Sequence, residues 1–131
     1  MQTVLLVEDS KLLRIAGERA LKNAGYRVIL AGDGEDALRL AGSGSPHVII
    51  LDMLLPKLSG EEVLRSLKKQ ALTAQIPVIV LSGLSKQNED KLIREGAFAF
   101  LEKGSLLDDP DALLRSIKQA LTPRKASRSC S

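Results

Sequence analysis

The chain has 131 residues, of which 44% are hydrophobic and 27% charged, with a formal net charge of +3. This length suits one globular domain with its own core, and no apolar run approaches the roughly 18 residues of a membrane span. Cys130 is the only cysteine, which excludes a disulfide framework and a cluster of thiolate metal ligands. The opening MQTVLLVEDS lacks the basic flank and cleavage site of a signal peptide, so we expect a cytoplasmic location and no membrane contact.

The basic excess lies in the last ten residues. Three of the 19 basic residues and none of the 16 acidic residues fall within 122–131, which leaves 16 of each in residues 1–121. A nucleic-acid surface needs clustered basic side chains with aromatic residues nearby, and the chain has only one tyrosine and two phenylalanines. We therefore predict no direct nucleic-acid binding. Residues 122–131 are predicted to be a disordered tail, with contact to nucleic acid or an anionic surface as the alternative.

The first half of the chain alternates strands with helices. Residues 4–7 form a short apolar run that predicts a strand, and Ser10 can cap a helix that continues to about residue 23. Gly25 ends this helix and a second strand follows over 26–31. Asp33 and Gly34 turn the chain into a helix over 35–41, and a Gly/Ser/Pro loop covers 42–46.

The second half repeats the alternation. Strands are predicted over 48–51, 76–81 and 97–101, and helices over about 60–71, 86–95 and 110–121. Ser59 and Glu62 have the spacing of a capping box, and Asp109 with Pro110 has the pattern of a helix start. Five strands that alternate with five helices predict an α/β fold with a parallel sheet covered on both faces, in three layers.

Charged and polar side chains follow four of these strands. Glu8 and Asp9 follow the first strand, Asp52 the third, Ser82 the fourth and Lys103 the fifth. The carboxyl ends of parallel strands meet at one edge of the sheet, so these side chains are expected to lie together. Two carboxylates about 4 Å apart repel by about 4 kcal/mol at an effective dielectric of about 20. One ammonium leaves this cluster at −2, and a hard divalent cation such as Mg²⁺ restores neutrality.

With a metal present, an ionised Asp52 becomes a candidate nucleophile of the acyl-phosphate kind. Lys103 supplies a positive charge and Ser82 a hydrogen bond to a phosphoryl group. Each residue also has a plainer explanation. Asp52 could simply end a strand, Lys103 could be a surface lysine, and Ser82 could cap a helix. Their joint position at the strand ends favours the phosphoryl site.

Five segments give the chain a family resemblance. In order and spacing, LLVEDS, AGDGEDAL, DMLLPKLSG, IPVIVLSG and GAFAFLEKG resemble the receiver domain of two-component response regulators, similar to the chemotaxis receivers, over about residues 2–121. The resemblance implies a flavodoxin-like (βα)5 fold with a doubly wound parallel sheet of order 2-1-3-4-5. Residues 1–121 would be the receiver domain and 122–131 a separate basic tail.

The same resemblance implies a role for each residue of the phosphoryl site. Asp52 would accept a phosphoryl group from a histidine kinase or a phosphotransfer protein, and Mg²⁺ would be the cofactor. Asp9, Asp52 and the main-chain carbonyl of Leu54 would bind the metal, and Glu8 would act mainly through metal-bound water. The domain would be a signalling module rather than an enzyme, with only self-catalysed phosphorylation and dephosphorylation.

A switch is also implied by the resemblance. Ser82 and Lys103 would contact the phosphoryl group, and Phe100 occupies the family's aromatic switch position. An inward movement of Ser82 would carry the loop 83–86 with it and let Phe100 rotate. The face formed by the fourth helix, the fifth strand and the last helix would then control a downstream protein or output domain, and could form a homodimer. The fourth helix has few apolar residues, which fits either a moving element or an ordinary solvated helix.

Three other functions are compatible with parts of the sequence. Residues 32–37 fit the G-x-G-x-x-A pattern of dinucleotide-binding domains, but its three acidic residues would repel a pyrophosphate. An aspartyl phosphohydrolase would need an acid two residues after Asp52, where Leu54 stands. A receiver-shaped interaction module that is never phosphorylated is the third, and the complete set of strand-end residues argues against it.

Overall fold

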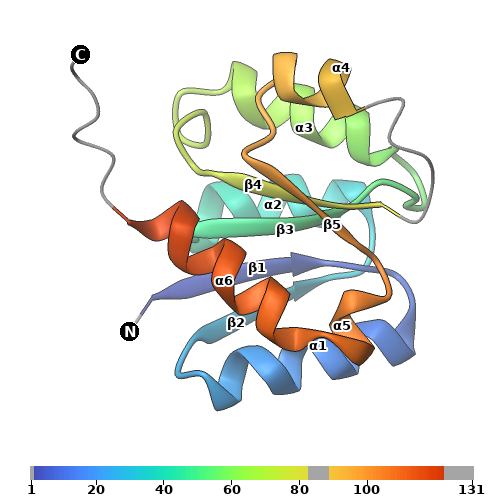
Figure 1. Cartoon of the computed structure of the whole chain (residues 1–131). Coiled ribbons are helices and arrows are strands. Elements are labelled where there is room, and N and C mark those ends of the chain that lie inside the picture. Colours follow the sequence, from blue (N-terminus) through green and yellow to red (C-terminus); the bar gives the residue numbers. More distant parts are fainter. Residues whose placement is uncertain (1, 83–88, 123–131) are drawn as a thin grey trace.

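The computed structural model describes residues 2–82 and 89–122, which form one five-stranded sheet (Figure 1). All neighbouring strands are parallel and their order is β2-β1-β3-β4-β5. The strands are β1 (Thr3–Val7), β2 (Arg27–Ala31), β3 (Val48–Asp52), β4 (Val78–Ser82) and β5 (Ala99–Glu102). The predicted fold class and strand order are confirmed.

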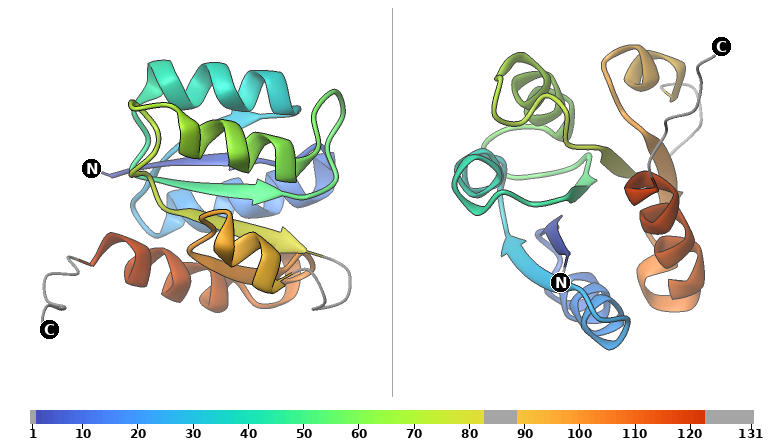
Figure 2. Two further views of the ribbon diagram at one scale, coloured as in Figure 1. Left: turned by 90° about the horizontal axis from the view of Figure 1, so that it is seen from above. Right: turned by 90° about the vertical axis from the view of Figure 1, so that its left-hand side faces the viewer.

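Helices cover both faces of the sheet. They are α1 (Lys11–Asn23), α2 (Gly34–Gly44), α3 (Gly60–Lys69), α4 (Glu89–Arg94), α5 (Ser105–Asp108) and α6 (Pro110–Leu121). One layer contains α1, α5 and α6, and the other contains α2, α3 and α4, as Figure 2 shows from two further directions. No helix within the described part of the chain is long and apolar enough to cross a membrane.

The central strands are apolar except at their ends, because both of their faces are buried. Successive side chains of a strand point to opposite faces, and β1 accordingly divides its residues between two clusters: Leu5 and Val7 face α2 and α3, while Val4 and Leu6 face α1 and α6. Every residue of β1 and β3 is buried. The continuous apolar runs that predicted strands are therefore explained by burial between two helical layers.

Three helix starts follow the predicted capping patterns. The hydroxyl of Ser10 accepts a hydrogen bond from the N–H of Leu13 at the start of α1. Ser59 and Glu62 form a complete capping box at α3. Asp109 caps α6, with Pro110 in its first turn. Since each cap satisfies backbone N–H groups that have no partner within the helix, these residues fix where the helices begin.

One helix was not predicted. The expectation of five helices is wrong for the described residues, because α5 forms a single turn between Lys103 and the start of α6. Four residues are too few to show helical periodicity. Leu106 of α5 is buried against Gly17 of α1, where a side chain on Gly17 would meet Leu6 and Leu106. The short helix is therefore held by tertiary packing rather than by its own propensity.

Several predicted bounds also shift. The helix predicted over 60–71 ends at Lys69, and the strands predicted to begin at residues 76 and 97 begin at Val78 and Ala99. The start of the helix predicted at Lys86, the loop 83–86 and residues 123–131 of the predicted tail lie outside the described residues.

Candidate functional site

Three carboxylates meet at the carboxyl edge of the sheet. Glu8 and Asp9 follow β1, and Asp52 ends β3. Because β1 and β3 are parallel neighbours with Val7 opposite Leu51, the residue after β1 comes to lie beside the end of β3. One carboxylate oxygen from each of the three residues lies within 4.8 Å of the others. Glu8 and Asp52 are buried, and Asp9 is exposed.

The ammonium of Lys103 lies beside this acidic cluster and contacts two of its carboxylates. Its Nζ lies 2.9 Å from Oδ2 of Asp52 and 3.6 Å from Oε2 of Glu8. The backbone N–H of Lys103 donates to the carbonyl of Ser82 at 3.1 Å, so the turn after β5 is tied to the end of β4. The sequence prediction that Glu8, Asp9, Asp52 and Lys103 lie together is thus confirmed as geometry.

Hydrogen bonds orient the two buried carboxylates. Oε2 of Glu8 accepts from the N–H of Ser10 at 2.9 Å, and Oδ1 of Asp52 accepts from the N–H of Leu54 at 3.2 Å. The second oxygen of Glu8, Oε1, is buried and has no hydrogen-bond partner among the described residues. A buried oxygen without a partner is costly, which indicates that the cluster is built to receive a further positive or hydrogen-bonding group.

The electrostatics of the cluster agree with this interpretation. Burial raises the pKa of Glu8; the N–H of Ser10 offsets part of that shift and the charge of Asp52 adds to it. Burial alone would lower the pKa of Lys103, but its hydrogen bond to Asp52 and the three nearby carboxylates raise that pKa overall. Three ionised carboxylates and one ammonium carry a charge of −2. Oxygen donors with this excess charge fit a hard divalent cation.

The remaining predicted residues are Ser82, Phe100 and Leu54. Ser82 ends β4, the strand that pairs with β3 on the side away from β1, and is half-buried. Phe100 is half-buried in β5 opposite Val80, and it packs against the hydrophobic core cluster that includes Leu92. The side chain of Leu54 is exposed, and its backbone lies beside Asp52 through the hydrogen bond described above.

Arg14 was missed by the sequence reasoning. Its guanidinium donates to the main-chain carbonyl of Glu8 at 3.3 Å, and it lies 3.0 Å from where a side chain on Gly32 would begin. Arg14 therefore joins the segment after β1 to the segment after β2. Its position one turn after the Ser10 cap was the available signal, but the sequence alone did not show toward which loop it points.

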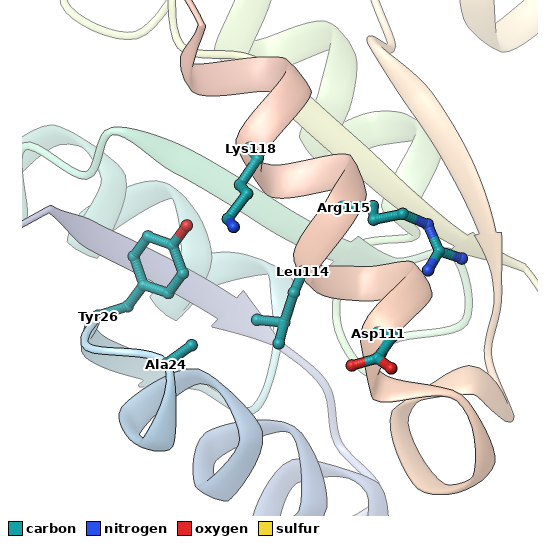
Figure 3. Close-up of a pocket in the computed structure, with 6 residues that line it drawn as sticks. All are labelled: Ala24, Tyr26, Asp111, Leu114, Arg115 and Lys118. Carbon is teal, nitrogen blue, oxygen red and sulfur yellow. The ribbon is translucent and has the colours of Figure 1, made fainter.

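One pocket beside α6 contains no residue of the acidic cluster. It has a volume of about 400 Å³ and lies between the end of α1 and α6 (Figure 3). Tyr26, which lines it, directly precedes β2 and so marks the amino edge of the parallel sheet. The candidate site lies at the opposite, carboxyl edge. We therefore take the acidic cluster, not this pocket, as the functional site.

Comparisons with known proteins identify the family to which this doubly wound sheet with its acidic carboxyl edge belongs. Residues 4–118 match the family model described as the response regulator receiver domain. The chain belongs to this family, whose members act in two-component signalling.

Similar proteins include complete regulators and isolated receivers. The response regulator MprA of Mycolicibacterium vanbaalenii is 33% identical over 121 residues, which cover 92% of this chain and 52% of that protein. The transcriptional regulatory protein AfsQ1 of Streptomyces coelicolor is 39% identical over 90 residues, which cover 69% of this chain and 37% of that protein. The chain thus spans about half the length of MprA, and less of AfsQ1.

Solved receiver structures resemble the chain over nearly its whole length. The chemotaxis protein CheY4 of Vibrio cholerae has a TM-score of 0.84 at 30% identity, covering 92% of this chain and 99% of that one. The receiver domain of the sensor histidine kinase PA1611 of Pseudomonas aeruginosa has a TM-score of 0.82 at 29% identity, covering 92% and 97%. That structure has a magnesium ion coordinated in its active-site cleft.

Proposed function

We propose that this chain is a phosphoacceptor in a two-component phosphorelay, in which Asp52 takes a phosphoryl group from a histidine kinase or a phosphotransfer protein. One observation carries the proposal. Asp52 is 1% exposed at the end of a central strand, yet its carboxylate faces two further carboxylates and the ammonium of Lys103. A buried acid in these surroundings is suited to phosphoryl transfer rather than to stabilising the fold.

The transfer is a displacement at phosphorus. A carboxylate oxygen of Asp52 forms the new P–O bond while the P–N bond to the donor's imidazole breaks, and the imidazole keeps the electron pair and takes a proton from water. Lys103, already 2.9 Å from Asp52, stays close enough to offset charge on the phosphoryl oxygens. The hydroxyl of Ser82, at the end of the neighbouring strand, contacts the transferred group.

Mg²⁺ is the proposed cofactor. Asp9, Asp52 and the main-chain carbonyl of Leu54 would hold the ion, and Glu8 would act mainly through metal-bound water. When bound, the ion supplies positive charge against the phosphoryl oxygens. The unpartnered Oε1 of Glu8, the excess charge of −2 and the magnesium in the PA1611 receiver support this assignment.

Phosphorylation is proposed to act through Ser82 and Phe100. A phosphoryl group adds negative charge and acceptor oxygens beside Ser82, and β4, β5 and α4 share the packing around Phe100. A shift of Ser82 would therefore change the face formed by α4, β5 and α6. Helix α6 corresponds to the last of the five helices predicted from the sequence. That face would contact a downstream protein, an output domain or a second copy of the chain.

The proposed role is that of a cytoplasmic signalling domain rather than an enzyme, with turnover limited to its own phosphoryl group. The alternative is a receiver-like interaction module that is not phosphorylated. The two differ in one measurable property, namely whether Asp52 can be loaded with a phosphoryl group.

Intact mass after treatment with acetyl phosphate and Mg²⁺ tests the proposal. The wild-type chain should gain one phosphoryl group, and Asp52→Asn should gain none while keeping the same far-UV circular dichroism. Omitting Mg²⁺ or adding a chelator should suppress the gain in the wild type. Equal phosphorylation of both proteins would remove Asp52 from its role, and no gain in either would favour the interaction module.

A further inference from the structure

Helix α4 is weakly anchored to the core. Among the described residues of this helix Leu92 alone is buried, while Ile93 beside it is half-exposed. Figure 1 shows α4 next to α3, at the far side of the sheet from α6. With one buried leucine in Glu89–Arg94, the position of this part of α4 depends on further contacts with its neighbours.

Four charged side chains supply those contacts. On α3, Glu61 accepts from Arg65 at 2.8 Å, and Lys91 of α4 lies 2.8 Å from the same oxygen of Glu61. Arg65 also donates through Nε to Oε2 of Glu95, directly after α4, at 3.3 Å. We call Glu61, Arg65, Lys91 and Glu95 the α3–α4 network. It contains two carboxylates and two cations, so its charges balance.

Arg65 binds both acids of the network: Glu61 on its own helix, α3, and Glu95 directly after α4. Its guanidinium binds Glu61 and Glu95 at the same time, a geometry that the single ammonium of lysine reproduces poorly. The second oxygen of Glu95, Oε1, is buried without a hydrogen-bond partner among the described residues. Loss of Arg65 would leave this partly buried carboxylate with no cation in the network, so α4 would lose its most specific tether.

The network is connected to the reactive edge through packing. Leu92 of α4 lies in the same cluster that Phe100 packs against. Phe100 lies opposite Val80 of β4, and the ends of β4 and β5 are joined by the hydrogen bond from Lys103 to Ser82. The packing of α4 thus extends to β4, which ends at Ser82, and to β5, which directly precedes Lys103.

We propose that Arg65 is a positioning residue that holds α4 against α3 in the unphosphorylated chain and so restrains phosphorylation of Asp52. This inference rests on the proposed function. If the phosphorylated state requires α4 to move, a tether present only in the unphosphorylated state lowers the population of chains ready to react. Breaking the tether should then speed phosphorylation without touching any residue of the acidic cluster.

The test compares Arg65→Gln with Arg39→Gln in the full chain. Arg39 is exposed on α2 and, within the described part of the chain, its side chain pairs with Asp36 alone, so this control removes the same charge and an ion pair away from α4. The rate of phosphoryl gain from acetyl phosphate and Mg²⁺ is measured by intact mass. Hydrogen exchange of α4 is measured in parallel without phosphodonor. Lys91→Gln, which breaks the network from its more exposed end, serves as a second variant if Arg65→Gln does not fold.

Arg65→Gln should be phosphorylated about three- to tenfold faster than Arg39→Gln, the range that a surface ion-pair network can supply. Exchange of α4 should also be faster in Arg65→Gln alone. Equal or slower phosphorylation in Arg65→Gln, with the wild type loaded normally at Asp52, would overturn this inference and leave the proposed function intact. No phosphoryl gain by the wild type would overturn both.

Discussion

Helices α4 and α6 both flank the β4–β5 side of the sheet, but they are attached by different forces. Helix α6 has twelve residues and buries Leu113 and Ile117 completely, in a cluster that also contains Leu106 of α5. Helix α4 has six described residues, buries Leu92 alone, and depends on the α3–α4 network. One helix is held by apolar area, and the other by one buried leucine together with ion pairs.

This difference separates a fixed element from an adjustable one. Apolar burial is non-directional and changes little with salt or with pH near neutrality. Exposed ion pairs are individually weak, depend on geometry and are screened by salt. A helix held in the second way can change position at small cost, which suits α4 to a regulatory role and α6 to a structural one.

The largest expected effect on stability comes from truncating a buried side chain of α6. Leu113→Ala should lower the free energy of unfolding by about 2–5 kcal/mol, because it leaves a cavity in a fully buried cluster. Denaturant unfolding followed by circular dichroism measures this change. Leu107→Ala, on the neighbouring α5 and half-exposed, is the control and should cost less than about 1 kcal/mol. Similar losses in both variants would contradict the assignment of α6 as the fixed helix.

A smaller effect is expected at α4. Leu92→Ala should cost about 2 kcal/mol or less, because the short helix can settle into the space that the side chain leaves. Hydrogen exchange should show the loss concentrated in α4, with the sheet still protected. A loss as large as that of Leu113→Ala, spread over the whole domain, would mean that α4 is anchored as firmly as α6.

The smallest expected effect is a change with pH in the stabilisation that the α3–α4 network supplies. Hydrogen bonds from Lys91 and Arg65 hold the pKa of Glu61 below its ordinary value of 4.5. Because the folded-state pKa is the lower one, the stabilisation is complete above pH 4.5 and is lost as the pH falls through the folded-state pKa. Carbon NMR titration of the Glu61 carboxyl measures this directly. In Lys91→Gln the pKa should move back toward 4.5, and an unchanged pKa would show that the Lys91 contact does not form in solution.

Local patterns were sufficient for most of the fold. The caps at Ser10, Ser59 and Asp109 each depend on residues within three positions, so the starts of α1, α3 and α6 could be predicted. Helix α5 could not, because its stability comes from Leu106 packing against Gly17, a contact between residues far apart in the sequence. The start of β4 at Val78 was also missed, since Ile76 is apolar but precedes the paired residues.

The acidic cluster was predictable for a topological reason. Parallel strands bring their carboxyl ends to one edge, so Glu8, Asp52 and Lys103 could be grouped without knowing any side-chain conformation. The α3–α4 network had no such rule. Arg65 and Glu95 are 30 residues apart, and only the packing of two helices on one face of the sheet brings them together.

The unpartnered oxygen of Glu8 has a consequence for how mutation can raise the stability of this domain. A carboxylate that is buried and lacks a hydrogen-bond partner for one oxygen is a place where neutral substitutions gain stability. Random mutation screened only for heat resistance would therefore favour replacement of Glu8, at the expense of the magnesium site that we propose there.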